Sequence, residues 1–435
     1  MKPESIRIYE NINLHYHYTE KFKTSQLSLY FVAPLQSPYA TAHRALLFNV
    51  LRRGSCAFPT QRELGIRLEE LYSADFSTSV FKRGDLQILH IGIATLRREF
   101  TKDGEDLLPG AAELLSELLL RPLTDRNTGV FLSEYVESEK KNAIDRIRAQ
   151  MNNKSYYARC RCVSHMCDGE VYGISEYGTP EDIEKITPAS LYGAYRALLS
   201  EATVEAFYTG SAPVDTVREA LAGIFADINR HPIRLPPPEP NPSARRVRRV
   251  KETTVAKQGK LCIGFRSSLR MEDPSRNAVL FFLCVFGVSP TSKLFVNVRE
   301  KLSLCYSCSA TNESSKGIML VTAGIENRNF RRTVREIFRQ FRAMRRGKIT
   351  EREIDLSRRI LINQFLSVED DPVLLERWYL YRTLSGVTET PEEAIAALEK
   401  VTVRDLRAVA LTYRPDTVYF LRGDAAGIAE DKQDA

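Results

Sequence analysis

Short apolar runs typical of strands and longer apolar patterns with helical spacing follow one another along this chain. In the first half they predict strands at 26–32, 74–81 and 86–94, and helices at 42–53, 60–72, 110–120 and 131 to about 166. The turn KRGD, whose glycine can supply a positive φ, predicts that the last two strands form a hairpin. Strands followed by grouped helices predict an α+β fold, in which an antiparallel-rich mixed sheet has helices packed on one face.

The same series of patterns occurs twice. Four segments of the first half have counterparts in the second half, in the same order and at slowly drifting offsets: RALLF at 44–48 and NAVLF at 277–281, LQILHIGI at 86–93 and IMLVTAGI at 318–325, ITPASL at 186–191 and VTVRDL at 401–406, and TVEAFYTG at 203–210 and TVYFLRG at 417–423. Chance can supply one such match, but four in order indicate a duplication. We therefore expect two domains of the same fold.

A proline-rich stretch, HPIRLPPPEPNP, separates the two copies. Such stretches act as semi-rigid spacers, and 435 residues are enough for two to four domains. The sequence predicts an N-terminal domain at 1–230, a linker at 231–243 and a C-terminal domain at 244–435. The basic run SARRVRRVK at 243–251 follows the prolines, and we interpret it as the solvated tail of the linker.

The charge balance is mildly basic, since 62 Lys and Arg residues against 55 Asp and Glu residues give +7. These charges are spread over many amphipathic helices and match no nucleic-acid-binding motif. The longest apolar run, 278–288, is far shorter than the roughly 18 residues of a membrane span and predicts a buried helix. The first residues also lack the apolar region of a secretory signal. We expect a cytoplasmic protein whose partners include neither nucleic acid nor membrane.

Eight cysteines are present, and in a cytoplasmic protein they are expected to be reduced. The cluster CRCVSHMC at 160–167 lacks the paired C-x2-C spacing of structural zinc sites and lies in a helical pattern, so it predicts buried thiols. Cys305 and Cys308 do form a C-x2-C. On a strand their side chains point to opposite faces, so this C-x2-C is a weak signal for a metal site.

The duplication, the linker and the motif RE-K-x-x-L-x-Y, which runs from Arg299 to Tyr306, resemble the insulinase and pitrilysin metallopeptidases, the group that includes the mitochondrial processing peptidases. The resemblance covers essentially the whole chain. It implies that the first domain carries an inverted zinc motif, H-x-x-E-H, with a downstream glutamate as the third protein ligand. It also implies that the second domain supplies Arg299 and Tyr306 to the substrate.

The zinc motif is the place where this sequence departs from the family. Aligning RRGS with the K-G-T that usually follows the motif places Ala45, Phe48 and Asn49 on the positions of the histidines and the general base. Glu139 matches an acid that supports the metal ligands, but Arg146 falls on the position of the downstream glutamate. A cation there would repel zinc, so we expect no metal or other cofactor in this chain.

A chain without the zinc site that keeps the arginine and tyrosine suggests a division of labour between two chains. By themselves the two residues would be an ordinary surface arginine and a sheet tyrosine, and only their place in the motif favours function. A guanidinium offers planar donors to a peptide carbonyl, and a phenol can donate to an oxyanion. The leading hypothesis is a zinc-free subunit of a bacterial type, inactive alone, which completes the active site of a zinc-bearing paralogue and acts on a peptide or small protein. The alternative is a peptidase-derived scaffold or assembly subunit with no role in proteolysis.

Overall fold

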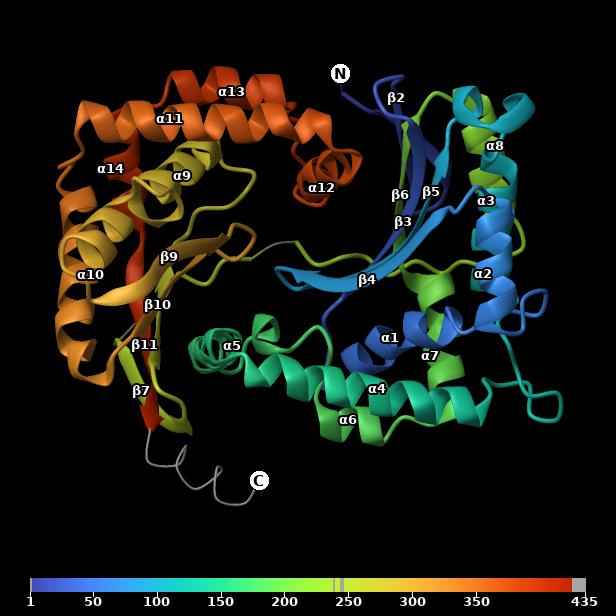
Figure 1. The fold of residues 1–435 in the computed structure, drawn as a ribbon, viewed down its shortest axis with the longest axis horizontal. Coiled ribbons are helices and arrows are strands. Elements are labelled where there is room, and N and C mark those ends of the chain that lie inside the picture. The colour runs from blue at the N-terminus through green and yellow to red at the C-terminus, as the bar shows by residue number, and fades with distance from the viewer. Residues whose placement is uncertain (1, 238, 243–245, 425–435) are drawn as a thin grey trace. The chain divides into compact units, whose positions relative to one another are not determined.

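The computed structural model describes residues 2–237, 239–242 and 246–424 (Figure 1). The chain forms two compact units, one made of 1–148 with 174–237 and the other of 149–173 with 238–435. Each unit contains one mixed sheet with packed helices, which confirms the α+β class. The linker at 231–243 and the boundary at 244 stay predictions, and residues 238 and 243–245 lie outside the described part of the chain.

The sheet of the first unit has the strand order β1-β2-β6-β3-β5-β4. Its strands are β1 (Glu4–Tyr9), β2 (Ile12–Tyr18), β3 (Thr24–Pro34), β4 (Asp75–Arg83), β5 (Leu86–Leu96) and β6 (Thr203–Gly210). β2 and β6 are parallel, whereas the other neighbours are antiparallel. The predicted β4–β5 hairpin is confirmed, and Gly84 in its turn has a φ of 53°.

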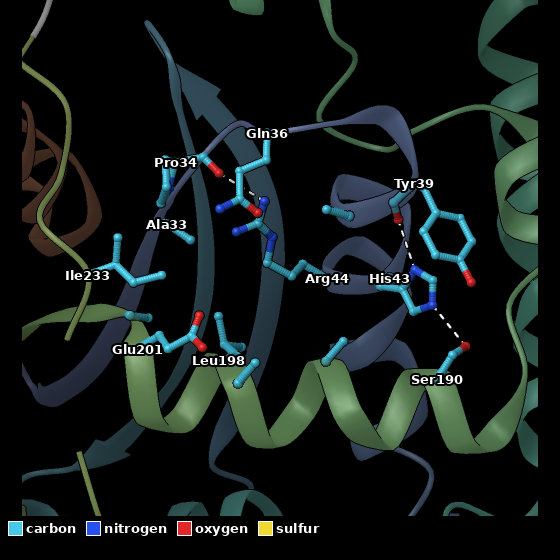
Figure 2. Close-up of a pocket in the computed structure, with 14 residues that line it drawn as sticks. Ala33, Pro34, Gln36, Tyr39, His43, Arg44, Ser190, Leu198, Glu201 and Ile233 are labelled. Atoms are coloured by element: carbon cyan, nitrogen blue, oxygen red, sulfur yellow. Dashed lines mark hydrogen bonds between the residues drawn. The ribbon is translucent and has the colours of Figure 1, made fainter. Parts of the chain in front are cut away.

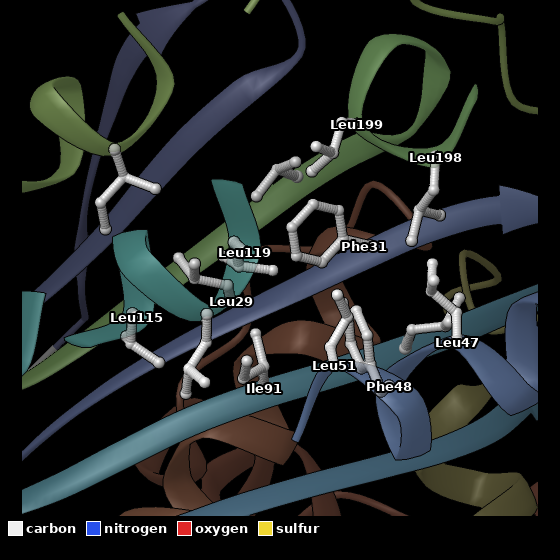
Figure 3. Close-up of a cluster of buried hydrophobic side chains, with 14 of the residues drawn as sticks. Leu29, Phe31, Leu47, Phe48, Leu51, Ile91, Leu115, Leu119, Leu198 and Leu199 are labelled. Carbon is white, nitrogen blue, oxygen red and sulfur yellow. The ribbon is translucent and has the colours of Figure 1, made fainter. Parts of the chain in front are cut away.

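Helices cover one face of this sheet. They include α1 (Pro38–Leu51), α2 (Gln61–Glu70), α3 (Leu108–Leu120), α4 (Ser133–Asn152), α6 (Pro180–Glu184), α7 (Pro188–Glu201) and α8 (Val214–Phe225). Figure 3 shows the core between sheet and helices, where strand residues such as Phe31 and Ile91 meet Leu47 and Phe48 of α1 and Leu115 of α3. The apolar positions that predicted strands and helices therefore form one shared core.

The second unit has the strand order β7-β11-β8-β10-β9. Its strands are β7 (Arg248–Val255), β8 (Gly259–Arg266), β9 (Cys305–Glu313), β10 (Ile318–Ile325) and β11 (Arg414–Asp424), and its helices are α5 (Lys154–Met166), α9 (Arg276–Leu283), α10 (Phe330–Arg345), α11 (Glu351–Leu366), α12 (Pro372–Thr383), α13 (Pro391–Glu399) and α14 (Val403–Thr412). Two π-helical segments, Cys284–Val288 and Phe295–Glu300, follow α9. The apolar run at 278–288 is thus a largely buried helix, as predicted.

The two sheets repeat one topology. Leaving β1 aside, the order β2-β6-β3-β5-β4 corresponds to β7-β11-β8-β10-β9, and in each sheet only the first pair in that order is parallel. The matched segments 86–93 and 318–325 are β5 and β10, which each lie next to the edge strand. The matched segments 203–210 and 417–423 form β6 and most of β11. The duplication predicted from the sequence is therefore present in the strand topology.

The basic run after the prolines is not simply a linker tail. From Arg248 onward it forms β7, which pairs in parallel with β11 from Arg248 opposite Thr417 to Val255 opposite Asp424. The strand lies at the sheet edge, and its side chains alternate between exposed and half-buried positions. Charged residues are common on edge strands because they discourage pairing with other chains. The prediction of a solvated tail was therefore wrong for 248–251.

The long helical pattern at 131–166 is interrupted at Asn153. Its side-chain oxygen accepts hydrogen bonds from the backbone N–H groups of Ser155 and Tyr156, as a helix N-cap does, and so starts α5 as a separate helix. The segment 149–173, although it comes from the first half of the sequence, belongs to the second compact unit. Figure 1 shows α5 on the side of the second sheet opposite α10. An amphipathic pattern predicts a helix but does not show which sheet the helix covers.

The packing of α5 explains the buried thiols. Cys162 and Cys167 lie with Met166 in a small core against Cys262 of β8 and Tyr419 of β11. The Cys162 thiol lies 3.7 Å from the backbone oxygen of Cys262, and Cys160 is only half-buried. Gly264 of β8 permits the close approach of α5 to the sheet, because a Cβ there would lie 2.5 Å from the Met166 sulfur.

Among the described helices, none is long and apolar enough to cross a bilayer.

Glu252 of β7 anchors α5 to the sheet. It accepts hydrogen bonds from Arg161 Nη2 of α5 at 2.7 Å and from the Tyr419 hydroxyl at 2.8 Å. Burial alone would raise the pKa of Glu252, but the hydrogen bonds from Arg161 and Tyr419 outweigh it and lower the pKa to about 2. The ionised carboxylate therefore stabilises the folded state above its ordinary pKa of 4.5, and this contribution is lost as the pH falls from 4.5 towards 2.

We expect Glu252→Gln to weaken this dependence on pH. Thermal unfolding midpoints measured from pH 6 to pH 2 should fall less steeply below 4.5 in the variant than in the unmodified chain, because the variant has no carboxylate to protonate at this site. Glu219→Gln, which changes an exposed carboxylate on α8, is the matched control and should leave the pH profile unchanged. Identical profiles for the unmodified chain and Glu252→Gln would contradict the role of Glu252.

Candidate functional site

The three zinc-motif positions on α1 hold residues that cannot bind a metal. α1 begins where Ser37 caps the helix and Pro38 occupies its first turn. Phe48, at the position of the general base, is buried in the core and meets Phe31 edge to face at a centroid distance of 5.7 Å. Ala45 and Asn49, one turn before and one residue after it, are half-buried. Neither a methyl group nor an aromatic ring donates an electron pair to zinc, and an amide is not among its usual ligands.

The positions on α4 do not restore a site. Arg146 is exposed, and its charge opposes the burial that raises the pKa of Tyr177. Glu139 is buried, and its Oε1 accepts hydrogen bonds from Arg53 Nε at 2.6 Å and Asn142 Nδ2 at 3.1 Å. The acid that would support metal ligands is instead neutralised by the arginine that follows α1. The donors at these positions therefore do not fit zinc.

No group of three or more His, Cys, Asp or Glu side chains with the geometry of a metal site occurs in the residues that the structure describes. We expect the purified chain to contain no stoichiometric zinc and to cleave no peptide alone, because both the ligands and the general base are replaced. Elemental analysis after dialysis against a weak chelator, together with a peptide-cleavage assay, tests this expectation. One tightly held zinc per chain would contradict it.

Arg299 lies on a widened helical turn. Within Phe295–Glu300 the Lys301 N–H donates to the Val296 carbonyl at 3.0 Å, five residues back, as in a π-helix. Such turns are often found at functional sites. The Arg299 guanidinium lies over the Phe295 ring, 4.5 Å from its centroid, and Nε is 3.5 Å from Glu300 Oε1. Its side chain is nevertheless 42% exposed, so the planar donors remain accessible.

Tyr306 lies near the start of β9, the edge strand of the second sheet, and is 66% exposed. Residues 307–313 pair one to one with β10, ending with Ser307 opposite Gly324, but Ile325 then pairs with Cys305. Tyr306 is therefore the extra residue of a β-bulge, and such bulges re-aim side chains at sheet edges. In the described part of the chain, no other residue forms a hydrogen bond with the Tyr306 hydroxyl.

The structure brings the two motif residues onto adjoining segments of one unit. The π-helical segment packs against β9, and the charge of Arg299 reaches the thiol of Cys305, the residue before Tyr306. A fixed guanidinium and an exposed phenol are hydrogen-bond donors suited to a peptide carbonyl and to developing negative charge on its oxygen. Neither is a nucleophile or a general base at neutral pH, so this pair can bind and stabilise but cannot begin hydrolysis.

The sequence did not reveal a cavity of about 280 Å³ in the first unit, which Figure 2 shows between α1, α7 and the segment after β3. His43 of α1 holds Nδ1 2.8 Å from the Tyr39 carbonyl oxygen and Nε2 2.9 Å from Ser190 Oγ, and burial lowers its pKa. Burial also lowers the pKa of Arg44 to about 10, so its guanidinium is still charged at neutral pH. Arg44 Nη2 donates to the Pro34 oxygen at 2.9 Å.

A second cavity occupies the equivalent place in the duplicated fold. It measures about 420 Å³ and lies between α9 and α14, the counterparts of α1 and α7. Asn277 stands where Arg44 stands in the first copy, and its amide donates to Glu389 Oε1 at 2.7 Å. A cavity between these two helices is thus a feature of both copies of the fold, so its presence does not by itself indicate a functional site. The exposed Arg299 and Tyr306 of the second unit are the stronger candidate site.

The sequence of this chain is similar to that of known proteins. The family model described as the Peptidase M16 inactive domain matches residues 185–361. A protein of Bacillus subtilis (strain 168) described as "Probable inactive metalloprotease YmfF" is 33% identical over 415 residues, covering 95% of this chain and 96% of the relative.

Solved structures agree in fold. A conserved protein from Enterococcus faecalis V583 has a TM-score of 0.90 at 28% identity, covering 98% of this chain and 99% of that one. A protease from Helicobacter pylori has a TM-score of 0.79 at 14% identity, covering 97% and 100%, and shows the fold alone. Because the Bacillus relative is 33% identical over nearly the full length of both chains and the family model matches residues 185–361, the chain belongs to the M16 peptidase family, as a homologue of a probable inactive metalloprotease.

Proposed function

We propose that this chain is the metal-free subunit of a two-chain peptidase. It pairs with a paralogue that carries an intact H-x-x-E-H motif and supplies Arg299 and Tyr306 to the substrate, a peptide or small protein. The name of the Bacillus relative, which describes an inactive metalloprotease, agrees with the missing metal site.

One contrast between the two copies of the fold supports this proposal. In the first unit the residues at the zinc-motif positions stabilise the fold, since Phe48 packs in the core and Glu139 forms an ion pair with Arg53. In the second unit Arg299 and Tyr306 are exposed side chains on a π-turn and a β-bulge, two local distortions that regular packing does not require. Distorted backbone that presents exposed polar groups is common at functional sites.

The roles of the two residues follow from their chemistry. Zinc in the partner would polarise the scissile carbonyl and activate water. Arg299 would hold a carbonyl of the bound peptide through its planar donors, and Tyr306 would donate its hydroxyl proton in a hydrogen bond to the carbonyl oxygen as negative charge develops there. Both roles require only hydrogen-bond donors, which the Arg299 guanidinium and the Tyr306 hydroxyl provide.

The cysteines support a cytoplasmic location for the pair. All eight are free thiols, and six of them are buried, all in the second unit. Proteins of oxidising compartments usually pair such residues in disulfides, whereas a reducing cytoplasm keeps them as thiols.

Co-purification from the native source tests the proposal. The tagged full-length chain should recover a partner whose sequence contains H-x-x-E-H, and the recovered complex should contain zinc and cleave peptides, while the tagged chain produced alone should do neither. A matched variant, Arg331→Ala on the exposed face of α10, should recover the same partner. Recovery of the chain in an assembly without any zinc-bearing paralogue would contradict the proposal and favour a scaffold role.

A further inference from the structure

The bulge at Tyr306 has a second effect, which concerns the two cysteines beside it. Cys305 pairs with Ile325 and Cys308 pairs with Ala323 on β10. Ile325 and Ala323 are two residues apart and therefore point to the same face of the sheet. Because one extra residue separates the cysteines, they also share that face, and both are buried, at 9% and 5% exposure. The prediction that they point to opposite faces was wrong, since it assumed a regular strand.

The pairing also sets how far apart the cysteines are. Two residues of β10 span about 6.7 Å, at roughly 3.3–3.4 Å per residue. Cys305 and Cys308 lie opposite the ends of that span, so their Cα atoms are separated by a similar distance. Disulfides join Cα atoms roughly 4.4–6.8 Å apart. The bulge therefore brings the pair to the upper end of the range for a disulfide, whereas a regular strand would hold residues three apart at about 10 Å.

The two thiols are chemically unequal. The hydrogen bond from the Cys308 thiol and the nearby positive charge of Arg299 lower the pKa of Cys305. The same hydrogen bond and burial raise the pKa of Cys308 well above its usual range. Thiolates are the nucleophiles of thiol chemistry, and a cation next to a cysteine favours the thiolate. Cys305 is thus the thiol that reacts first, and Cys308, on the same face of the sheet, is the thiol that reacts second.

We propose that Cys305 and Cys308 form a reversible dithiol–disulfide site for which hydroperoxides are the oxidant, and that the disulfide closes a ring around Tyr306 and Ser307. The Cys305 thiolate attacks the terminal peroxide oxygen, the O–O bond breaks, and the departing oxygen takes a proton and leaves as water from hydrogen peroxide or as an alcohol from an organic hydroperoxide, so Cys305 becomes a sulfenic acid. The Cys308 sulfur then attacks the Cys305 sulfur, the S–O bond breaks, and the hydroxide leaves as water with the Cys308 proton. Two thiols lose two electrons, and one hydroperoxide group gains them.

Ring closure would act directly on the bulge. Tyr306 and Ser307 are the only residues between the two sulfurs, and a disulfide near the mode of its geometry would draw the Cα atoms closer than the pairing with β10 holds them. The backbone of the bulge must adjust, and with it the direction of the exposed tyrosine. This chemistry is independent of any partner, so its test does not depend on the function proposed above.

The experiment uses the full-length reduced chain carrying Cys56→Ala, which removes the exposed cysteine. The chain is treated with one equivalent of hydrogen peroxide, alkylated and digested, and the peptides are identified by mass spectrometry. We expect the peptide containing Cys305 and Cys308 to lose two hydrogen atoms and to regain them with dithiothreitol. Cys284, a cysteine whose pKa is raised by burial, serves as the internal control and should remain reduced.

Two variants separate the steps. Cys308→Ser should stop at a sulfenic acid on Cys305 that dimedone traps, and Cys305→Ser should leave Cys308 reduced. In the chain that keeps both Cys305 and Cys308, the rate of backbone hydrogen exchange at Tyr306 and Ser307 should change on oxidation. Reduction should restore the original rate. If Cys305 and Cys308 both stay reduced while Cys284 oxidises, or if they oxidise without forming the intrachain link, the proposal is overturned. Because the chain carrying only Cys56→Ala decides this outcome, a Cys305 or Cys308 variant that fails to fold does not affect it.

Discussion

Replacing Tyr306 by Phe should slow peptide turnover by the reconstituted pair of this chain and its zinc-bearing partner about 10²–10³-fold, the usual effect of losing one oxyanion donor. The substitution removes only the hydroxyl, which has no hydrogen-bond partner in the described part of the chain, so folding and pairing should be unchanged. Arg299→Ala should lower turnover by a comparable factor. Arg299→Lys should restore little of it, because a lysine keeps the charge but not the planar donors.

The measurement is the initial rate of peptide cleavage at saturating partner, beside a direct measurement of pairing. Tyr18→Phe, which removes the hydroxyl of another exposed tyrosine, is the matched control and should retain full activity. Full activity in both Tyr306→Phe and Arg299→Ala would make the two residues ordinary surface side chains and would leave the scaffold hypothesis ahead.

Replacing Arg266 by Met should destabilise the second unit by about 3–5 kcal/mol, as expected when one partner of a buried ion pair is removed. Arg266 is only 2% exposed. Its Nε donates to Asp416 Oδ2 at 2.9 Å, and its Nη2 donates to Glu170 Oε1 and to the Met166 oxygen, each at 2.5 Å. The variant would leave two carboxylates without their cation and would remove a link from β8 to β11 and to the end of α5.

Urea unfolding followed by circular dichroism measures this effect. Arg331→Met, on the exposed face of α10, is the matched control and should change the free energy of unfolding little. The double variant Arg266→Met with Asp416→Asn should recover part of the lost free energy of unfolding, since it also removes the Asp416 charge that no longer has a cationic partner. Equal stability of Arg266→Met and the unmodified chain would show that the network around Arg266 does not hold this unit together.

The features that could be predicted from the sequence are those carried by local patterns. Apolar spacing predicted β5 and α1 to within a few residues, and repeated patterns predicted that β5 and β10 hold equivalent places. The loss of the metal site could also be predicted, because a side chain such as Phe48 lacks donor atoms in any conformation. Arg299 and Tyr306 are predicted as site residues only through their place in a motif, since nothing in the two residue types alone distinguishes them, and their role stays a prediction.

The features that could not be predicted depend on contacts between distant segments. The amphipathic pattern of α5 is the same whichever sheet it covers. The charged run at the start of β7 becomes a strand only because β11 offers it backbone partners. The shared face of Cys305 and Cys308 depends on a one-residue shift against β10, which changes the side of the sheet that each residue faces.

The position of α5 has a consequence for how the protein is made. The helix lies early in the chain, yet its partners include Tyr419 and Leu421 of β11, the last described strand. During synthesis the apolar face of α5 must therefore wait for nearly the entire remaining chain to leave the ribosome before it can be covered. A nascent chain halted after the first half would expose this face, and release of a truncated product lacking β11 would leave both α5 and β8 open to aggregation. Completion of the last strand is thus the step that commits the early helix to its native place.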